Sequence, residues 1–194
     1  MRVIAGKFRR RTLKALPGLD TRPTYDRLKE TLFNVLTPAG GLENAVFIDL
    51  FAGTGSIGIE ALSRGAAQVY FVECSRKAVR IIRENLASLR ITEGCEILEK
   101  RAPEALRELS SRALRCRFCF LDPPYKMEGA YQEMLRLIAG LELLSEDGVV
   151  IAEHDKHFDP GGGVGRLKRY RCLTQGESAL SFYRRLTPSG QRGD

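Results

Sequence analysis

The chain has 194 residues, of which 43% are hydrophobic, and this size suits a single domain with its own core. It shows no amino-terminal secretion signal and no apolar run near the ~20 residues of a membrane span, and its five scattered cysteines argue against a disulfide framework. We therefore expect a cytoplasmic protein without membrane contact, whose net charge of +7 favours an anionic partner.

The positive charge is concentrated at the amino terminus. Residues 1–30 hold nine Lys or Arg against three Asp or Glu, so this segment carries most of the net charge. A basic segment on a near-neutral body is typical of proteins that contact phosphate backbones, although basic surfaces also maintain solubility.

Residues 1–40 predict a small extension ahead of the main domain. Residues 2–8 are expected to form a strand that bends at Gly6 and pairs with residues 12–16 as a β-hairpin. A helix is expected after Pro23, with Thr24 as its amino-terminal cap. Its apolar residues recur at near-helical spacing: Tyr25, Leu28, Leu32 and Leu36.

From Val46 onward, short apolar strands alternate with helical patterns. Strands are expected at 46–50, 68–72, 95–98, 117–121 and 148–153, with helices at 56–64, 75–90, after Pro103 and at 131–141. Strands at 165–170 and 179–184 follow a glycine-rich loop without a helix between them, so an antiparallel hairpin is expected to end the sheet. The order predicts a doubly wound, mostly parallel α/β domain over residues 41–187, with a disordered tail at 188–194.

A glycine-rich loop joins the first strand of this domain to its first helix. Gly53, Gly55 and Gly58 form G-x-G-x-x-G between a strand and a helix, the context that nucleotide-binding loops require. Glycine permits positive φ angles and lets a ligand approach the backbone closely. Glu73 ends the second strand and is placed to accept hydrogen bonds from two ribose hydroxyls. These features fit a dinucleotide-dependent oxidoreductase as well as a methyltransferase.

Asp49 distinguishes these two classes. It lies at the end of the first strand, four residues before Gly53, where its charge would repel the diphosphate of a dinucleotide. A cofactor that carries an ammonium and a sulfonium, as S-adenosylmethionine does, would instead be attracted. The alternative is that Asp49 only caps the following helix.

Asp122, Pro123, Pro124 and Tyr125 follow an apolar strand directly. Neither proline donates a backbone hydrogen bond, and each restricts the residue before it to extended geometry. A carboxylate, a free carbonyl and an aromatic face are thus held together, which suits a planar group with an exposed amine, such as a nucleobase. Open α/β sheets bind ligands outside the carboxyl ends of their strands, so the turn lies where chemistry is expected.

These motifs together resemble a known family. Residues 49–55, Glu73 and residues 122–125 resemble the Rossmann-like S-adenosylmethionine-dependent amino-methyltransferases. Three further segments, residues 2–6, 21–27 and 30–34, are similar to the bacterial 16S ribosomal RNA guanine-N2 methyltransferases. The resemblance extends from Arg2 to about Arg185 and implies a class I methyltransferase fold with a seven-stranded sheet.

The resemblance also implies an activity and partners. The expected reaction moves a methyl group from S-adenosylmethionine to the exocyclic N2 amine of one guanine in 16S ribosomal RNA. The expected partner is that RNA within the small ribosomal subunit or an assembly intermediate. We expect a monomer without a metal site.

The resemblance assigns the site residues in three groups. The catalytic group is Asp122, Pro123, Pro124 and Tyr125. The cofactor group is Asp49, Phe51, Ala52, Gly53, Thr54, Gly55, Glu73, Cys74, Arg101 and Ala102. The RNA-binding group is Arg9, Arg10, Arg11, Arg22, Thr24 and Arg27. Relatives often carry Asp or Asn just before the alanine, where this chain has Arg101, so adenine would be held there by Arg101 or by backbone groups.

Three other functions each fit part of the sequence. An oxidoreductase leaves Asp49 and the Asp-Pro-Pro-Tyr turn unexplained, and a non-catalytic RNA-binding module leaves both ligand loops without a role. An adenine- or cytosine-N methyltransferase acting on DNA or another RNA would use the same Asp-Pro-Pro-Tyr chemistry, because each of these bases carries an exocyclic amine. Only the resemblance of the amino-terminal segments selects guanine.

Overall fold

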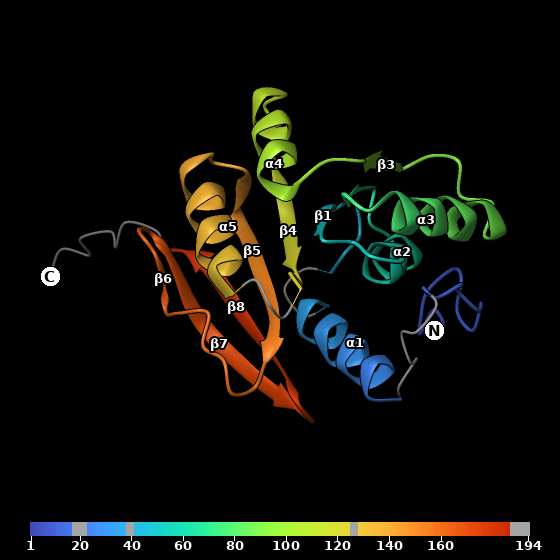
Figure 1. The fold of residues 1–194 in the computed structure, drawn as a ribbon, viewed down its shortest axis with the longest axis horizontal. Coiled ribbons are helices and arrows are strands. Elements are labelled where there is room, and N and C mark those ends of the chain that lie inside the picture. The colour runs from blue at the N-terminus through green and yellow to red at the C-terminus, as the bar shows by residue number, and fades with distance from the viewer. Residues whose placement is uncertain (17–22, 38–40, 125–127, 187–194) are drawn as a thin grey trace, which may run out of the picture.

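The computed structural model describes residues 1–16, 23–37, 41–124 and 128–186. These residues form an α/β fold around an eight-stranded mixed sheet (Figure 1). The helices are α1 (Pro23–Leu36), α2 (Ser56–Ser63), α3 (Arg76–Ser88), α4 (Ala102–Ser111) and α5 (Glu128–Gly140). The strands are β1 (Val46–Leu50), β2 (Gln68–Val72), β3 (Cys95–Leu98), β4 (Cys116–Leu121), β5 (Leu144–Asp155), β6 (Gly163–Val164), β7 (Leu167–Gln175) and β8 (Ser178–Arg185).

The sheet has the strand order β3-β2-β1-β4-β5-β8-β7-β6. Strands β1 to β5 pair in parallel, whereas β8, β7 and β6 add antiparallel at one edge. The chain order reverses between β1 and β4, and such a switch point leaves a crevice at the carboxyl ends of the two strands. The expected parallel sheet and its terminal hairpin are confirmed.

Apolar side chains cover both faces of the sheet, as parallel strands require. One face packs against α1, α2 and α3, and the other packs against α4 and α5. Successive strand residues point to opposite faces, so Phe118 and Phe120 belong to the first core and Cys119 and Leu121 to the second.

The sheet has eight strands rather than the seven implied by the family resemblance, because the glycine-rich segment before β7 pairs with it. Gly163 and Val164 form β6 opposite Lys168 and Leu167. A Cβ on Gly163 would lie 2.1 Å from the carbonyl oxygen of Leu167, so only glycine allows this pairing. Part of the predicted loop is therefore a strand.

The structure does not show the expected amino-terminal hairpin as two regular strands. Residues 1–16, here called the arm, contain one isolated antiparallel bridge between Arg2 and Thr12. Beside this bridge the N–H groups of Val3 and Leu13 donate to the carbonyls of Arg11 and Met1, but later N–H groups of the arm donate to side chains of α2. Ile4 and Ala5 donate to the Glu60 carboxylate, and Phe8 donates to Ser63 Oγ.

Two predicted features fall at the limits of the described residues. Helix α1 begins at Pro23, one residue before the expected cap Thr24, and the side chain of Thr24 lies outside the description. Residues 188–194, the expected tail, also lie outside it. In the described part of the chain, no helix has both the length and the apolar character of a membrane span.

Candidate active site

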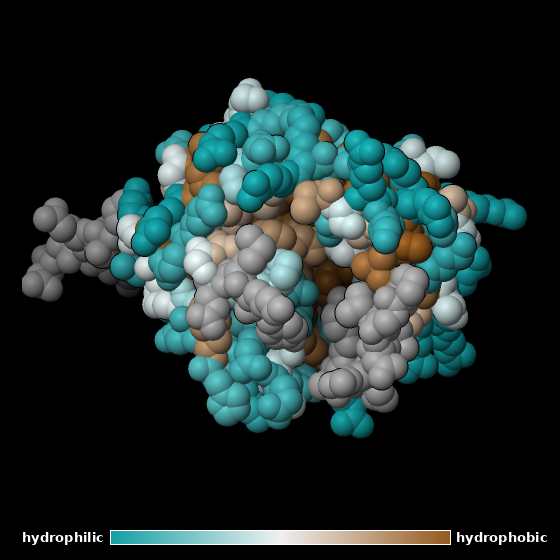
Figure 2. Space-filling model, in the orientation of Figure 1, coloured by the Kyte–Doolittle hydropathy of each residue, from teal (hydrophilic) through white to brown (hydrophobic). Residues whose placement is uncertain are grey.

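The carboxyl ends of β1, β2 and β4 bring the predicted motifs to one edge of the sheet. Leu50, the last residue of β1, is in register with Val72 on one side and with Leu121 on the other. Glu73 and Asp122 directly follow those two residues, so they flank the loop that leaves β1. Figure 2 shows an apolar hollow in the middle of this view, near the carboxyl end of β4.

The loop after β1 has the backbone geometry of a tight ligand cradle. Phe51, Gly53 and Gly55 have φ angles of 63°, 57° and 77°. These values lie in the left-handed region of backbone conformation, which a residue with a bulky side chain such as Phe51 rarely adopts. Strain of this kind concentrates at functional sites. Gly58 serves packing instead, because a Cβ there would lie 2.3 Å from Cε1 of Phe71 in β2.

Glu73 holds the loop and remains half-buried at its edge. Its Oε2 accepts a hydrogen bond from the N–H of Gly53 at 2.9 Å, and its Oε1 accepts one from the N–H of Ser75 at 2.8 Å. Each carboxylate oxygen has capacity for a further donor, so Glu73 can also accept from hydroxyls of a bound nucleoside.

Asp49 is 2% exposed and lies beneath the same loop. Its Oδ2 accepts a hydrogen bond from the N–H of Gly58 at 2.9 Å, so it does cap α2, the alternative considered from the sequence. Burial raises the pKa of Asp49 to about 7, the neighbouring Asp122 and Glu73 carboxylates add to this rise, and the Gly58 hydrogen bond opposes it. Within the described chain, nothing donates to its other oxygen, so Asp49 retains an acceptor for a ligand.

Asn85 is a loop-supporting residue that the sequence did not reveal. It is 1% exposed on α3, and its Nδ2 donates to the carbonyl of Thr54 at 3.0 Å. The same amide accepts from the N–H of Lys14 at 2.8 Å and donates to the Lys14 carbonyl at 3.2 Å. Asn85 therefore links the glycine loop to the arm. The sequence does contain one signal for Asn85, because it is a polar residue on the apolar face of α3.

The other predicted cofactor residues lie at the ends of β2 and β3. Cys74 is exposed next to Glu73. Arg101 is exposed at the amino terminus of α4, where its side chain caps nothing, and Ala102 is the first, buried residue of that helix. Their proposed contacts with adenine stay predictions.

Asp122 follows β4 without a break and is half-buried, with Pro123 buried behind it and Pro124 exposed. Tyr125 lies outside the described residues. Burial raises the pKa of Asp122. Asp122 in turn raises the pKa of Glu153, a 7% exposed residue of β5 that we did not predict as part of the site.

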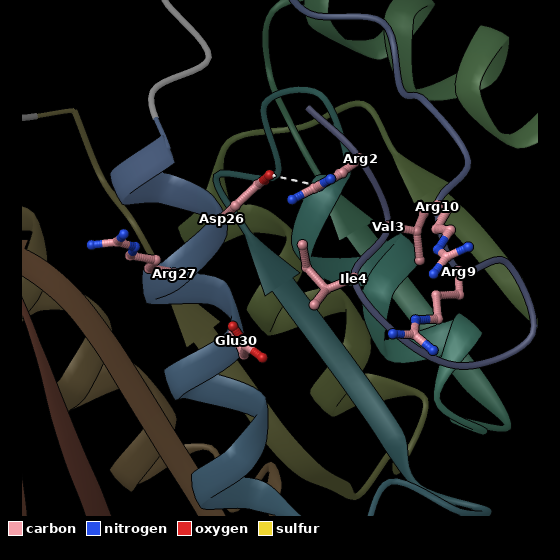
Figure 3. Close-up of a pocket in the computed structure, with 8 residues that line it drawn as sticks. All are labelled: Arg2, Val3, Ile4, Arg9, Arg10, Asp26, Arg27 and Glu30. Carbon is pink, nitrogen blue, oxygen red and sulfur yellow. Dashed lines mark hydrogen bonds and ion pairs between the residues drawn. The ribbon is translucent and has the colours of Figure 1, made fainter.

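Several predicted RNA-binding residues line one pocket of about 640 Å³ between the arm and α1 (Figure 3). Arg9 and Arg10 lie on its arm side, and Arg27 lines it from α1 with its guanidinium pointing away from the arm. Arg2 also lines the pocket and is paired with Asp26 at 3.1 Å. Arg11 lies elsewhere, since its guanidinium donates to the carbonyl of Ser88. Arg22 lies outside the described residues.

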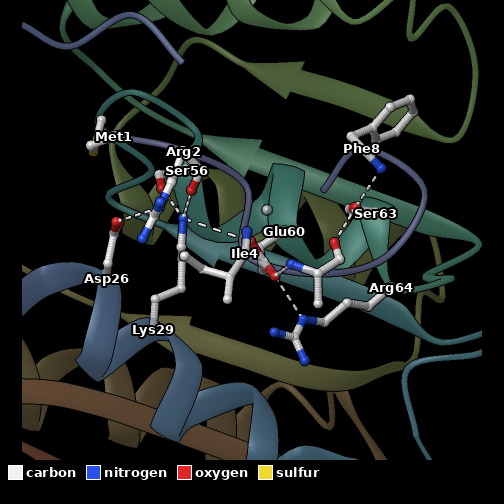
Figure 4. Close-up of polar contacts among 12 residues, drawn as sticks. Met1, Arg2, Ile4, Phe8, Asp26, Lys29, Ser56, Glu60, Ser63 and Arg64 are labelled. Carbon is white, nitrogen blue, oxygen red and sulfur yellow. Dashed lines mark hydrogen bonds and ion pairs between the residues drawn. The ribbon is translucent and has the colours of Figure 1, made fainter. Parts of the chain in front are cut away.

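A buried ion pair fastens the arm to the domain (Figure 4). The Lys29 ammonium donates to the carbonyl of Arg2 at 2.6 Å and to Ser56 Oγ at 3.1 Å, and it lies 3.7 Å from Glu60 Oε2. The Glu60 carboxylate also accepts from Arg64 Nε at 2.7 Å. Because Ser56 begins α2, this network joins the arm to the helix that follows the glycine loop.

The residues present fit S-adenosylmethionine. The positive φ angles of Gly53 and Gly55 create a backbone cradle, and Glu73 borders it with acceptor oxygens. The buried Asp49 supplies negative charge below the cradle, which matches a cationic ligand and opposes a diphosphate.

The chain is similar to known proteins over nearly its whole length. A family model described as "Conserved hypothetical protein 95" matches residues 1–184. "Putative rRNA methyltransferase YlbH" of Bacillus subtilis (strain 168) is 40% identical over 95% of this chain and 99% of that protein. "Ribosomal RNA small subunit methyltransferase D" of Escherichia coli (strain K12) is 32% identical over 95% of this chain and 90% of that protein.

A solved structure also matches. "Putative methyltransferase yhhF from Escherichia coli" aligns with a TM-score of 0.79 and 31% identity, covering 95% of this chain and 97% of that chain. The family match and these relatives span both the arm and the domain. This chain therefore belongs to the family described as Conserved hypothetical protein 95, with YlbH of B. subtilis and ribosomal RNA small subunit methyltransferase D of E. coli as relatives.

Proposed function

We propose that the protein transfers a methyl group from S-adenosylmethionine to the exocyclic N2 amine of a guanine in 16S ribosomal RNA, within the small subunit or an assembly intermediate. One observation carries the proposal. The Asp122-Pro123-Pro124 turn lies at the same sheet edge as the glycine loop, Asp49 and Glu73. An amine acceptor and a cofactor cradle thus adjoin each other in a family that contains rRNA methyltransferases.

The cofactor is held by backbone and carboxylates. Gly53 and Gly55 allow close approach, Glu73 accepts from ribose hydroxyls, and Asp49 faces the cationic amino acid portion. When bound, S-adenosylmethionine supplies an electrophilic methyl group on a positively charged sulfur. Cys74, Arg101 and Ala102 border the adenine in this proposal.

The Asp122 carboxylate and the Pro123 carbonyl orient the target amine by accepting its two hydrogens. These hydrogen bonds draw the nitrogen lone pair out of conjugation with the ring and direct it toward the methyl donor. Tyr125 stacks on the flipped base, as aromatic side chains commonly do with unstacked RNA bases. The alkylated nitrogen releases its extra proton readily, so orientation and electrostatics supply most of the catalysis.

The basic residues at the amino terminus bind the RNA backbone. Arg9, Arg10 and Arg27 surround one pocket and can contact phosphates there. We assign Arg11, Arg22 and Thr24 to the same RNA surface. Because α1 and the arm both adjoin the domain near the glycine loop, phosphate contacts there position the base at the site.

Replacing Asp122 separates catalysis from cofactor binding. In Asp122→Ala, methyl transfer to small ribosomal subunits is expected to be abolished, because the amine loses an acceptor that fixes its orientation. Cofactor affinity, measured by titration calorimetry, is expected to stay within about twofold, since the cradle is formed by other residues. Activity equal to that of the unmodified protein would contradict the proposed mechanism.

A further inference from the structure

We propose that Glu153 recognises the ring N1–H of the target base and so makes the site specific for guanine. The inference rests on the proposed methyl transfer to an exocyclic amine and adds a residue that selects the base. Three carboxylates, Asp49, Asp122 and Glu153, lie near the carboxyl ends of the neighbouring strands β1, β4 and β5.

The strand register brings Glu153 next to Asp122. Leu121 in β4 is paired with Ala152 in β5, so the following residues, Asp122 and Glu153, adjoin each other. Alternation along β5 puts Glu153 on the face of Ile151, which belongs to the core covered by α1.

Alternation places the other carboxylates on this same face. Asp49 is two residues after Phe47, and Asp122 is two residues after Phe120, so each carboxylate is on the same sheet face as that phenylalanine. Burial is the main cause of the raised pKa of both Asp49 and Glu153, and the neighbouring Asp122 carboxylate adds to the rise in each. Glu153 therefore lies on the Asp122 side of the site, on the sheet face that α1 covers.

The Glu153 carboxylate lacks the donors that a structural carboxylate has. It is 7% exposed, and no hydrogen bond or ion pair reaches it from any residue that the structure describes. Glu60 in the same protein is fully buried and accepts from two backbone N–H groups and Arg64 while facing Lys29. The Glu153 oxygens are not among the fully enclosed side-chain atoms without a partner, so they stay accessible to a donor that a ligand supplies.

The backbone of Glu153 is held firmly. Glu153 is paired with Leu180 of β8, and its backbone carbonyl accepts a hydrogen bond from the Tyr131 hydroxyl at 2.7 Å. A rigid strand that presents an unsatisfied carboxylate is suited to recognition, because little order is lost when the ligand binds.

The chemistry of the bases then gives specificity. Guanine carries an N–H at N1 beside its exocyclic amine, so a carboxylate next to Asp122 can accept it. Adenine carries an unprotonated acceptor nitrogen at N1, and cytosine carries one at N3, next to the amine. In its charged form, which the guanine N1–H stabilises, the Glu153 carboxylate repels either of these acceptors. Burial and the nearby Asp122 raise the pKa of Glu153, and a donor from the base favours its charged form.

The test is Glu153→Gln, assayed on reconstituted small subunits whose methylated position carries guanine or adenine. The amide can donate to adenine N1, so it no longer rejects that base. For guanine we expect kcat/KM to fall by about 10-fold to 100-fold, the range for losing a hydrogen bond to a charged group. The guanine-to-adenine ratio of kcat/KM is expected to fall at least about 10-fold.

Controls separate recognition from folding and from the proposed function. Glu146→Gln changes an exposed carboxylate on the same strand and should leave the ratio unchanged. Glu153→Asp keeps the charge and should retain the preference for guanine at reduced kcat/KM. Equilibrium binding of the two particles, which needs no methyl transfer, should show the same loss of preference in Glu153→Gln.

An unchanged guanine-to-adenine ratio in Glu153→Gln, in turnover and in binding, would overturn the inference even if total activity fell. Failure of the unmodified protein to methylate guanine in any small-subunit particle would instead overturn the proposed function. The two failures are therefore distinguishable.

Discussion

Asp49 combines a structural and a ligand-binding role in one carboxylate. One oxygen accepts the N–H of Gly58 and fixes the start of α2, while burial raises the pKa of Asp49 to about 7. A carboxyl group with so high a pKa is mostly protonated at pH 6 and mostly charged at pH 8. A cationic cofactor favours the charged form, so binding is linked to loss of this proton.

Cofactor affinity is therefore expected to rise with pH through about 7 and to level off above it. Below pH 7, the Kd should increase by up to about tenfold per pH unit, because a proton must leave Asp49 before the cation is attracted. Titration calorimetry with S-adenosylmethionine between pH 5.5 and 8.5 measures this directly.

The matched variant is Asp49→Asn, which keeps an oxygen for the Gly58 N–H and removes the titration. Its affinity should be weaker and nearly independent of pH. A pH dependence as steep as that of the unmodified protein would show that another group is responsible.

The sequence revealed some of these carboxylates better than others. Asp49, Glu73 and Asp122 were identifiable because each follows an apolar strand and adjoins a turn motif. Glu153 was not, because β5 was expected to end at that residue, where a carboxylate would be solvated. The strand continues to Asp155 and pairs with β8, which buries Glu153. Burial by a strand distant in sequence leaves no local signal.

At the scale of elements, the arm folds back on itself only around the bridge between Arg2 and Thr12, and it is otherwise attached to α2. Glu60 accepts the N–H groups of Ile4 and Ala5 and faces the buried ammonium of Lys29. Burial lowers the pKa of Lys29, and the Glu60 carboxylate opposes this effect. The network therefore depends on the charge of Glu60.

Glu60→Gln is expected to lower the free energy of unfolding by about 3–5 kcal/mol, because it leaves the Lys29 charge buried without its partner. Denaturant unfolding measures the loss, and hydrogen exchange should show weaker protection of the amides of Ile4 and Ala5. Glu84→Gln is the matched control, since Glu84 pairs with the exposed Lys14 of the same arm and such pairs contribute about 0–1 kcal/mol. Equal losses in both variants would contradict the anchoring role.

Element boundaries show what local pattern predicts. The strands 46–50, 68–72 and 95–98 were predicted to the residue, because each is an apolar run between polar or turn residues. The amino-terminal segments pair only around Arg2 and Thr12, because the next backbone donors bind side chains more than fifty residues away, on Glu60 and Ser63. Helix α1, β4 and β8 were each predicted to within two residues at both ends.

At the scale of the whole molecule, the charge is asymmetric and matches a polyanionic substrate. The arm and α1 present Arg9, Arg10 and Arg27 around one pocket (Figure 3). Arginines of α3 are instead neutralised locally, as Arg76 and Arg83 pair with Glu99 and Arg80 pairs with Glu84. Arg9, Arg10 and Arg27 take part in no ion pair with the described residues, so their charge on the arm side of the protein is available to phosphates.

RNA binding is expected to weaken steeply with salt, and replacing Arg9, Arg10 and Arg11 by Gln should reduce that dependence. Each lost phosphate contact lowers the slope of log Kd against log salt by about 0.7 to 0.9. Filter binding to small subunits between 50 and 300 mM salt, roughly the range over which such contacts are screened, measures the slope. KM for the subunit should rise while cofactor affinity is unchanged.

The control replaces Arg76, Arg80 and Arg83 of α3 with Gln, which removes the same number of positive charges. Its effect on the slope should be smaller, because those arginines already pair with carboxylates. Slopes reduced equally by the two triple variants would indicate that net charge, rather than the arm, binds the RNA.

The central claim is tested most directly by the methylated product. The protein is incubated with methyl-labelled S-adenosylmethionine and, in parallel, with small ribosomal subunits from cells lacking this methylation, naked 16S RNA, or DNA. The nucleosides are then separated and identified. We predict label in N2-methylguanine from the ribosomal RNA. Label in adenine or cytosine, or in DNA alone, would contradict the claim.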